Sequence, residues 1–160
     1  MLDSNVFIQS HRMAYPFDVF PSYWLQLKEL SENGSIISID KVRKEICDGQ
    51  TDLLATWCNA DLDVNFFKDT TECIEKYAAI SRYINSHSIY SRTAKDTYLQ
   101  TDYVDSWIVA HCLHHNQIVV TNELSAPASI KNVKIPDVCN HFSVRCITPI
   151  EMLREIGSTI

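Results

Sequence analysis

The chain alternates short apolar stretches with longer segments whose apolar residues recur at helical spacing, and this alternation constrains the fold more than any other feature. The clearest example is VDSWIVAHCLHHN (104–116), where apolar residues recur four apart, followed at once by the β-prone stretch QIVVTNE (117–123). Strands that are separated by helices run parallel and carry helices on both faces. The sequence therefore predicts an α/β fold with a central, mostly parallel sheet flanked by helices.

The rest of the chain continues this alternation. Further strands are expected at about 2–8, 131–135 and 144–148, with a short apolar piece at 35–40. Helices are expected from near Ser22 to Gly34 and over 39–46, 51–60, 70–86, 104–116, 136–142 and 149–157. No internal repeat or low-complexity linker interrupts these elements, and 160 residues are enough for one core. We therefore expect a single domain over residues 1–160.

Composition narrows the function classes. Apolar residues make up 46% of the chain, with only three glycines and five prolines, which is typical of an ordinary globular protein. The formal net charge is -6, whereas a domain that holds nucleic acid by charge alone carries a positive one. Any phosphate-bearing substrate would therefore need a local group of basic residues or a bridging cation.

The cysteine pattern and the hydropathy bear on the compartment. The six cysteines are widely spaced and include no Cys-x-x-Cys pair, so neither a zinc site of that type nor a disulfide framework is supported. We expect mostly buried thiols in a reducing compartment. No charged and apolar leader precedes Leu2, and no apolar run approaches the roughly 18 residues that span a bilayer. These features predict a soluble, cytoplasmic protein without a membrane segment.

Polar side chains stand at the ends of two expected strands. Asp3, Ser4 and Asn5 interrupt the apolar start of the chain, and VVTNE ends in Glu123. Because sites in parallel sheets form at the carboxyl ends of the strands, these groups should meet at one edge. Asp105, at the start of an expected helix, could be brought to the same edge.

Four motifs in this order carry a resemblance to a known family. LDSNVFI (2–8) is similar to the LDTNVFI opening of PIN-domain nucleases, and Glu45 in KVRKEI resembles their helical glutamate. Asp105 in VDSWIVAHC resembles the aspartate that opens a later helix, and VVTNE resembles their last strand with its acidic end. YPFDVFPSYW (15–24) and VKIPDVCNHF (133–142) are similar to a poorly characterised PIN-like branch related to toxin–antitoxin ribonucleases. The resemblance covers nearly the whole chain and implies a PIN-like three-layer fold.

The resemblance also implies a metal-dependent nuclease whose acids bind Mg²⁺ or Mn²⁺. Phosphodiester hydrolysis needs a nucleophilic water and a stabilised leaving oxygen, and these ions supply both. Hard cations take oxygen ligands and keep several waters, so a few carboxylates from separate elements suffice. Asp3 and Asp105 are the expected direct ligands. Glu45 and Glu123 would complete the catalytic acidic cluster, either directly or through water.

Three polar residues would support these acids. Ser4 stands where the family usually has threonine, and it keeps a hydroxyl that can orient a ligand or a water. Asn5 would brace the strand end by hydrogen bonds, and Asn122 lies next to Glu123 in the second strand-end motif.

Each acid also has a purely structural interpretation. Asp3 could be a turn residue, Asp105 a helix N-cap, and Glu45 part of a solvated helix face. Asp102 lies about one turn before Asp105, so a shifted register would make Asp102 the ligand instead. Many family members carry an aspartate near Glu123, which leaves open whether another acid completes the site.

Basic residues are few and lie near two of the motifs. Arg12 closely follows the first expected strand, and Arg43 lies between Lys41 and Lys44 next to Glu45. We expect Arg12 and Arg43 to contact a phosphate backbone, with solvated helix charges as the alternative.

His111 and His115 in HCLHH are four apart, which is the spacing of a helical metal pair. No glutamate stands between them as in H-E-x-x-H, and no third ligand is identified, so we favour a surface helix end. The aromatic residues of 15–24 could stack bases, but packing of Trp24 and its neighbours within the domain is the favoured interpretation.

These observations predict an endoribonuclease that hydrolyses RNA phosphodiester bonds, as the toxin-type members of the family do. An antitoxin protein would then be a partner, and a homodimer would add binding surface to an acidic domain with a small basic rim. The alternative from another class is a non-catalytic PIN-like module that binds RNA or a protein. A phosphotransfer receiver is disfavoured, because such proteins use paired aspartates at one strand end and LDSN supplies one.

Overall fold

The structure is a computed structural model that describes residues 1–47 and 51–158. Its helices are α1 Ser4–Gln9, α2 Pro21–Glu32, α3 Asp40–Cys47, α4 Leu53–Asp61, α5 Ile74–Ser86, α6 Arg92–Tyr98, α7 Val104–His115, α8 Ile135–His141 and α9 Pro149–Ile156. A π-helical turn (η1, Ser10–Ala14) follows α1, and 3₁₀ turns cover Val64–Phe66 (η2) and Thr71–Cys73 (η3). The strands are β1 Ser38–Ile39, β2 Phe67–Lys68, β3 Val119–Val120 and β4 Cys146–Ile147. The chain is thus a mixed α/β protein that is mostly helical.

The strands form two parallel pairs. β1 pairs with β2 so that Ser38 lies opposite Phe67, and β3 pairs with β4 so that Val119 lies opposite Cys146. Parallel pairing with intervening helices is what the alternating sequence predicts, so the α/β class and the parallel direction are confirmed.

The first residues of the chain join these two pairs. The Leu2 amide donates to the Ile37 carbonyl at 2.8 Å on the β1 side. On the other side, Leu2 forms a parallel bridge with Val120, and the Asp3 amide donates to the Val120 carbonyl at 3.0 Å. Residues 1–3 therefore lie between β1 and β3 and connect the hydrogen bonding of the two pairs.

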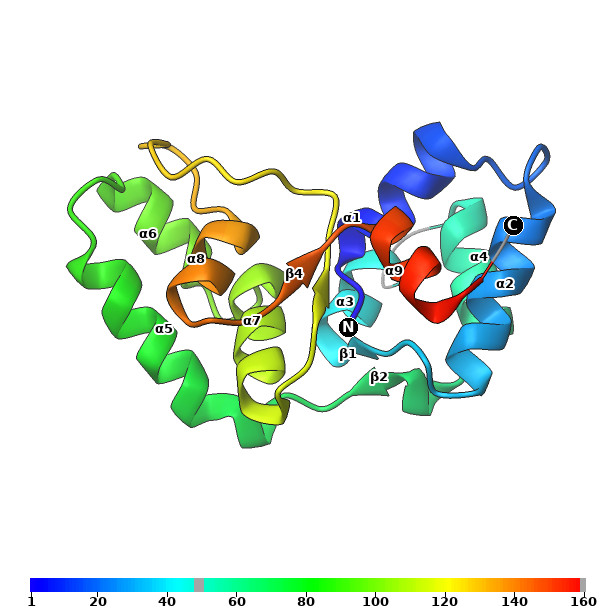
Figure 1. Cartoon of the computed structure of the whole chain (residues 1–160), viewed down its shortest axis with the longest axis horizontal. Helices are drawn as coiled ribbons and strands as arrows, with labels where there is room; N and C mark the ends of the chain where they lie inside the picture. Colours follow the sequence, from blue (N-terminus) through cyan, green and yellow to red (C-terminus); the bar gives the residue numbers. More distant parts are fainter. Residues whose placement is uncertain (48–50, 159–160) are drawn as a thin grey trace.

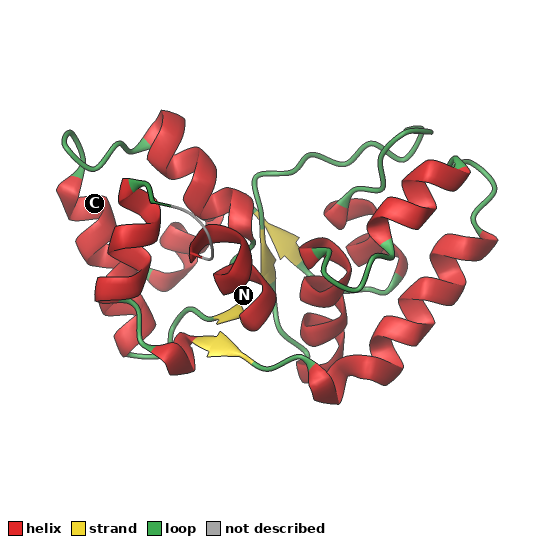
Figure 2. Ribbon diagram, turned by 180° about the vertical axis from the view of Figure 1, so that it is seen from behind, coloured by secondary structure: helices red, strands yellow, loops and turns green. Residues whose placement is uncertain are grey.

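Helices lie on both sides of the strands (Figure 1). Helices α5, α6, α7 and α8 lie on one side, and α1 to α4 with α9 lie on the other. Figure 2 shows from behind that the short strands run between these two groups. The N-terminus lies in the middle of the molecule, where Asp3 begins α1.

Helix α7 is the most buried of the described helices. Most of its residues are buried, including Ile108, Val109 and Ala110 at 0% exposure, and two polar side chains, Ser106 and His111, are buried with them. A helix that is apolar on all sides is found inside a fold, because each face meets another apolar element. This position fixes both ends of α7, where Asp105 and His115 lie.

The expected strand at 2–8 is wrong. Only Leu2 makes a strand-like bridge, and the chain enters α1 at Ser4. Asp3 occupies the N-cap position with extended backbone angles, φ -79 and ψ 155. Val6 and Phe7 still reach the core at 0% exposure, because helical geometry turns them toward it. The polar run at Asp3 is therefore the end of a very short strand and the start of a helix.

The strand expected at 131–135 is also wrong. Helix α8 begins at Ile135, and the preceding Lys134 has extended N-cap angles. The Ile135 amide donates to Glu123 instead of to a neighbouring strand. Helix α6 and strand β2 had no corresponding expectation in the sequence.

Other local expectations are confirmed. Gly34 ends α2 with φ 75, and Gly157 ends α9 with φ 72, conformations that glycine adopts without strain. Trp24 is buried, and its indole N–H donates to the Tyr15 carbonyl at 2.8 Å. All six cysteines carry thiols. Over residues 1–47 and 51–158, none of the helices has the length and apolar character needed to cross a bilayer.

Candidate functional site

The Asp3 carboxylate lies in the centre of the molecule and is 1% exposed. Its Oδ2 accepts a hydrogen bond from the Thr121 hydroxyl at 2.8 Å, and its Oδ1 accepts a longer one from Ser4 at 3.4 Å. Burial raises the pKa of Asp3 to about 6, because desolvation penalises the charged form, while the bond from Thr121 acts in the opposite direction. Glu123 and Glu45 raise this pKa further through their negative charge.

The amide side chain of Asn5 links the start of α1 to the end of β3. Its Nδ2 donates to the Thr121 hydroxyl oxygen at 3.0 Å, and its Oδ1 accepts from the Asn122 amide at 3.0 Å. The Glu123 amide donates to the same Thr121 oxygen at 3.1 Å. Asn5 thus makes hydrogen bonds to the end of β3, and Asn122 takes part mainly through its backbone.

Asp105 lies in the first turn of α7 and is partly buried. Burial raises the pKa of Asp105 well above its ordinary range, and the charges of Asp3, Glu123 and Glu45 raise it further. A hydrogen bond with the Tyr103 hydroxyl lowers it. Asp105 is not the N-cap of α7, because Tyr103 holds that position without a side-chain cap.

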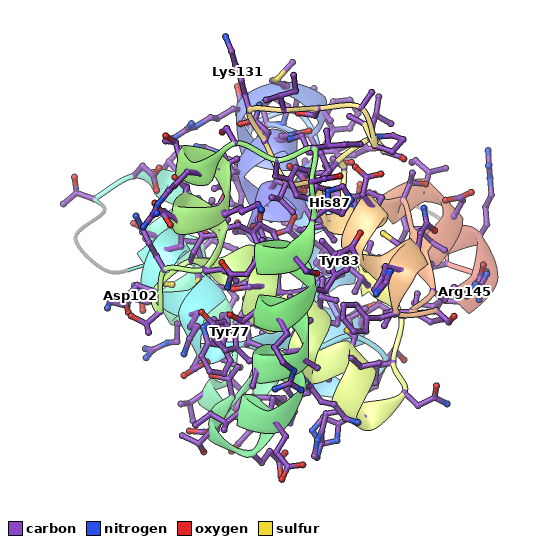
Figure 3. All side chains as sticks on the ribbon, turned by 90° about the vertical axis from the view of Figure 1, so that its left-hand side faces the viewer. Tyr77, Tyr83, His87, Asp102, Lys131 and Arg145 are labelled. Carbon is purple, nitrogen blue, oxygen red and sulfur yellow. The ribbon has the colours of Figure 1, made fainter. Side chains whose placement is uncertain are left out.

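Glu45 and Asp105 face one surface pocket of about 460 Å³. The pocket is lined by residues of α3 and of the segment that enters α7, namely Lys41, Lys44, Glu45, Asp102, Tyr103, Val104 and Asp105. Asp3 does not line it. Figure 3 shows Asp102 beside the cyan ribbon of α3, where its carboxylate pairs with Lys44 at 3.4 Å.

Glu123 is held by two bonds of its own. Its Oε1 pairs with the Lys134 ammonium at 2.6 Å, and its Oε2 accepts from the Ile135 amide at 2.9 Å at the start of α8. Glu123 also lines a smaller pocket of about 110 Å³, which it shares with Tyr103. It therefore acts on the other acids through its charge, while its oxygens stabilise α8.

The four predicted acids act on one another electrostatically. Glu45 and Glu123 both raise the pKa values of Asp3 and Asp105, and Asp3 raises that of Asp105. Within the part of the chain that the structure describes, no three of these acids bring ligand atoms within 4.8 Å of one another. The set of four acids therefore does not converge on one point. It does not form a closed cage of protein ligands.

The basic residues around this pocket differ from those that the sequence singled out. Lys41 and Lys44 line the pocket, whereas Arg43 does not. Arg43 is exposed on α3, and its charge opposes only part of the rise that burial causes in the pKa of Cys58 of α4. Arg12 is exposed in η1.

Two polar residues of the site had no place in the sequence interpretation. Thr121 donates to Asp3, and Tyr103 bonds Asp105 and borders both pockets. Thr121 could have been noted, because it follows the last apolar residue of its strand as Asp3 does. Tyr103 precedes α7, and no sequence motif marks Tyr103 as a site residue.

Comparison with known proteins places the chain by its whole length. Residues 1–160 match a family described as a domain of unknown function, DUF4411. The chain belongs to the DUF4411 family. No curated protein matches it, and no solved structure matches it. The chemistry of this DUF4411 chain therefore has to be argued from its own residues.

Proposed function

We propose that the chain is a metal-dependent endoribonuclease with a PIN-like three-layer fold. One observation carries the proposal: burial raises the pKa of both Asp3 and Asp105, which are 102 positions apart, and the charges of Glu45 and Glu123 raise both further. Burying carboxylates together destabilises a fold unless a proton or a cation neutralises them. The resemblance of LDSNVFI and VDSWIVAHC to PIN-domain nuclease motifs supports the same assignment.

The expected cofactor is Mg²⁺ or Mn²⁺, which when bound would polarise a phosphodiester and lower the pKa of a water. Asp3 and Asp105 would hold the ion, with Glu45 as a ligand from α3 and Glu123 acting through water. Thr121 and Ser4 orient the Asp3 carboxylate. Asn5 holds Thr121 in place by donating to its hydroxyl oxygen and by accepting from the neighbouring Asn122 amide. Tyr103 holds Asp105.

The proposed substrate is RNA, held by cations at the rim of the pocket. Lys41 and Lys44 lie beside Glu45 and Asp105, so a phosphate entering the pocket would meet two ammonium groups next to the acids. Arg12 and Arg43 would contact more distant phosphates. The net charge of -6 limits nonspecific binding, so an antitoxin protein or a second copy of the chain would supply further contacts. The six thiols agree with a cytoplasmic location.

Cleavage of single-stranded RNA with and without Mg²⁺ or Mn²⁺ tests the proposal. Wild type should cleave only with metal, and Asp3→Asn and Asp105→Asn should each lose at least a hundredfold in rate while remaining folded by circular dichroism. Asp96→Asn is the matched control, because Asp96 is exposed and pairs with Arg92 away from the pocket. Asp102→Asn tests the shifted register: loss of cleavage in this variant, with full activity in Asp105→Asn, would make Asp102 the ligand.

A non-catalytic PIN-like module that binds RNA or a protein is the second candidate. Two observations favour it: Asp3 is 1% exposed, and both oxygens of Glu123 already have partners. This candidate predicts binding of RNA or of a protein partner with no metal-dependent cleavage, and equal thermal shifts on metal addition in wild type and Asp3→Asn.

A further inference from the structure

A second group of metal-ligating side chains lies at the opposite end of α7 from Asp105. Cys73 ends η3, and His111 and His115 lie on the last turns of α7. A ligand atom from each of these three residues lies within 4.8 Å of those of the other two. Glu72, next to Cys73, places its Oε1 2.9 Å from the His115 Nε2. The site thus collects a thiol, two imidazoles and a carboxylate from two elements.

The expectation that His111 lies on a surface helix end is wrong, because the side chain is 2% exposed. Its Nδ1 is buried and has no hydrogen-bond partner. A buried ring nitrogen without a partner costs about 1–3 kcal/mol, so such atoms are rare unless something outside the chain satisfies them. A core histidine that served packing alone would have both nitrogens paired or one facing solvent. The unpartnered nitrogen therefore points to a ligand.

We propose that Cys73, His111 and His115 bind a divalent cation of the Zn²⁺ class, with a water in the fourth position and Glu72 bonded to His115 beside the site. Thiolate and imidazole ligands suit Zn²⁺, which takes four ligands in tetrahedral geometry. A hard cation such as Mg²⁺ takes oxygen ligands and is not selected by this set. The site could not be recognised from the sequence, because its ligands do not form a Cys-x-x-Cys or H-E-x-x-H motif.

The surroundings of the three residues fit this assignment. The Gln117 side chain makes a hydrogen bond with the His111 ring, and its Oε1 is buried with no other partner. A metal-binding imidazole usually donates its other N–H to such an oxygen. Gln117 is therefore the expected acceptor.

The proposed ion would fasten η3 to α7. His111 lies six residues beyond Asp105, or about 9 Å along the helix axis, and His115 lies about 15 Å from it. The site is thus separate from the acidic pocket, although the same helix carries both. Its role would be structural: it would hold the C-terminal turns of α7 against the start of α5 Ile74–Ser86.

Cobalt substitution tests this site in the full-length chain after chelator treatment. Wild type should bind one equivalent of Co²⁺ with the thiolate-to-cobalt absorption band, and Zn²⁺ should displace it and raise the melting temperature. Cys73→Ser should abolish the band, whereas Cys112→Ser, a matched change of a buried cysteine on α7, should keep it. No band in wild type, or a full band in Cys73→Ser, would overturn the proposal.

A variant of a partly exposed ligand tests the site in case Cys73→Ser fails to fold. His115 is partly exposed, so His115→Gln should fold normally and bind Co²⁺ at least tenfold more weakly. His141→Gln, a change of an exposed histidine on α8, should bind as wild type does. Equal affinity in the two variants would contradict the site. Asp105→Asn should keep the full band, so this result is independent of any nuclease activity.

Discussion

A carboxylic acid buried as deeply as Asp3 is ordinarily a source of instability. Its single short hydrogen bond, from Thr121, replaces only part of the hydration that an ionised carboxylate loses. Nearby Glu123 and Glu45 add repulsion. The residue is therefore protonated more readily than an ordinary aspartate, and in the proposed function a cation would take the place of that proton.

The first prediction concerns the pH dependence of stability. The folded-state pKa of Asp3, about 6, lies above the ordinary value of 3.8, so folded protein holds this proton more tightly than unfolded protein does. The stabilisation that the bound proton gives to the folded state is complete below about pH 4, and it disappears as the pH rises through 6. Asp3→Asn should match wild type near pH 4 and be about 2–3 kcal/mol more stable at pH 7.5 without metal. Denaturant unfolding of both proteins across this range measures the difference.

Glu45→Gln serves as the comparison, because it removes an exposed charge and should move the curve less. Parallel stability curves for wild type and Asp3→Asn would mean that Asp3 does not titrate in this range, which would remove the argument for a protonated site.

The second prediction concerns the Thr121 hydroxyl, which donates to Asp3 and accepts from the Asn5 amide group. Thr121→Val keeps the shape but leaves these buried groups without a partner, which should cost about 1–3 kcal/mol of unfolding free energy. Because the bond from Thr121 lowers the pKa of Asp3, that pKa should also rise in the variant. Thr121→Ser should restore both properties, and equal losses in the two variants would assign the effect to packing of the methyl group.

At the scale of elements, the sequence predicted helices better than strands. The apolar repeats of α7 are a local signal, and this signal was enough to place that helix. Strand β3 has only two residues, and the N-terminal segment pairs with it at the single bridge between Leu2 and Val120, so neither is long enough to show an alternating pattern. The run after Leu2 looked like a strand because Val6 and Phe7 are β-prone residues that packing places in a helix.

The same limit applies to the candidate sites. Asp3 and Asp105 were recognisable from motifs, whereas the bond from Thr121 to Asp3 joins residues 118 positions apart and leaves no local signal. The third ligand for His111 and His115 was missed for this reason as well, because Cys73 lies on another element. Long-range contacts decide which polar residues meet, and one sequence does not record them.

The third prediction concerns the start of α8, where Glu123 bonds Lys134 and the Ile135 amide. Glu123→Gln and Lys134→Met should each lower the unfolding free energy by about 1 kcal/mol, and the double variant should lose about 0.5–1 kcal/mol less than their sum. Denaturant unfolding of wild type, the two single variants and the double variant measures these losses. Additive losses would mean that the ion pair contributes nothing, and a lost metal response in Glu123→Gln alone would make Glu123 a ligand.

At the scale of the whole molecule, the burial of the cysteines shows how well the two helix groups shield the core from solvent. Cys146 on β4 is partly exposed, whereas the other five are buried. A hydrogen bond with Cys139 lowers the pKa of Cys146, while burial raises those of Cys73 and Cys112 to about 11 and 12.

The fourth prediction follows from this contrast. Under native conditions an alkylating reagent should modify Cys146 first, because a thiolate is the reacting form. In denaturant without reductant, intact mass should show six modified thiols. Faster reaction at Cys73 or Cys112 would show that the core opens readily, and fewer than six additions in denaturant would reveal a disulfide.

The position of residues 1–3 between β1 and β3 also bears on when the proposed acidic site can assemble during synthesis. Asp3 is made before its partners Val120 and Thr121, which come more than a hundred positions later in the chain. Contacts of such high sequence separation form late and slow the folding of a chain. A growing polypeptide would therefore carry its acidic residues unassembled until most of the chain has left the ribosome. For an enzyme that cuts RNA, this delay would keep the nascent chain inactive beside the message that encodes it.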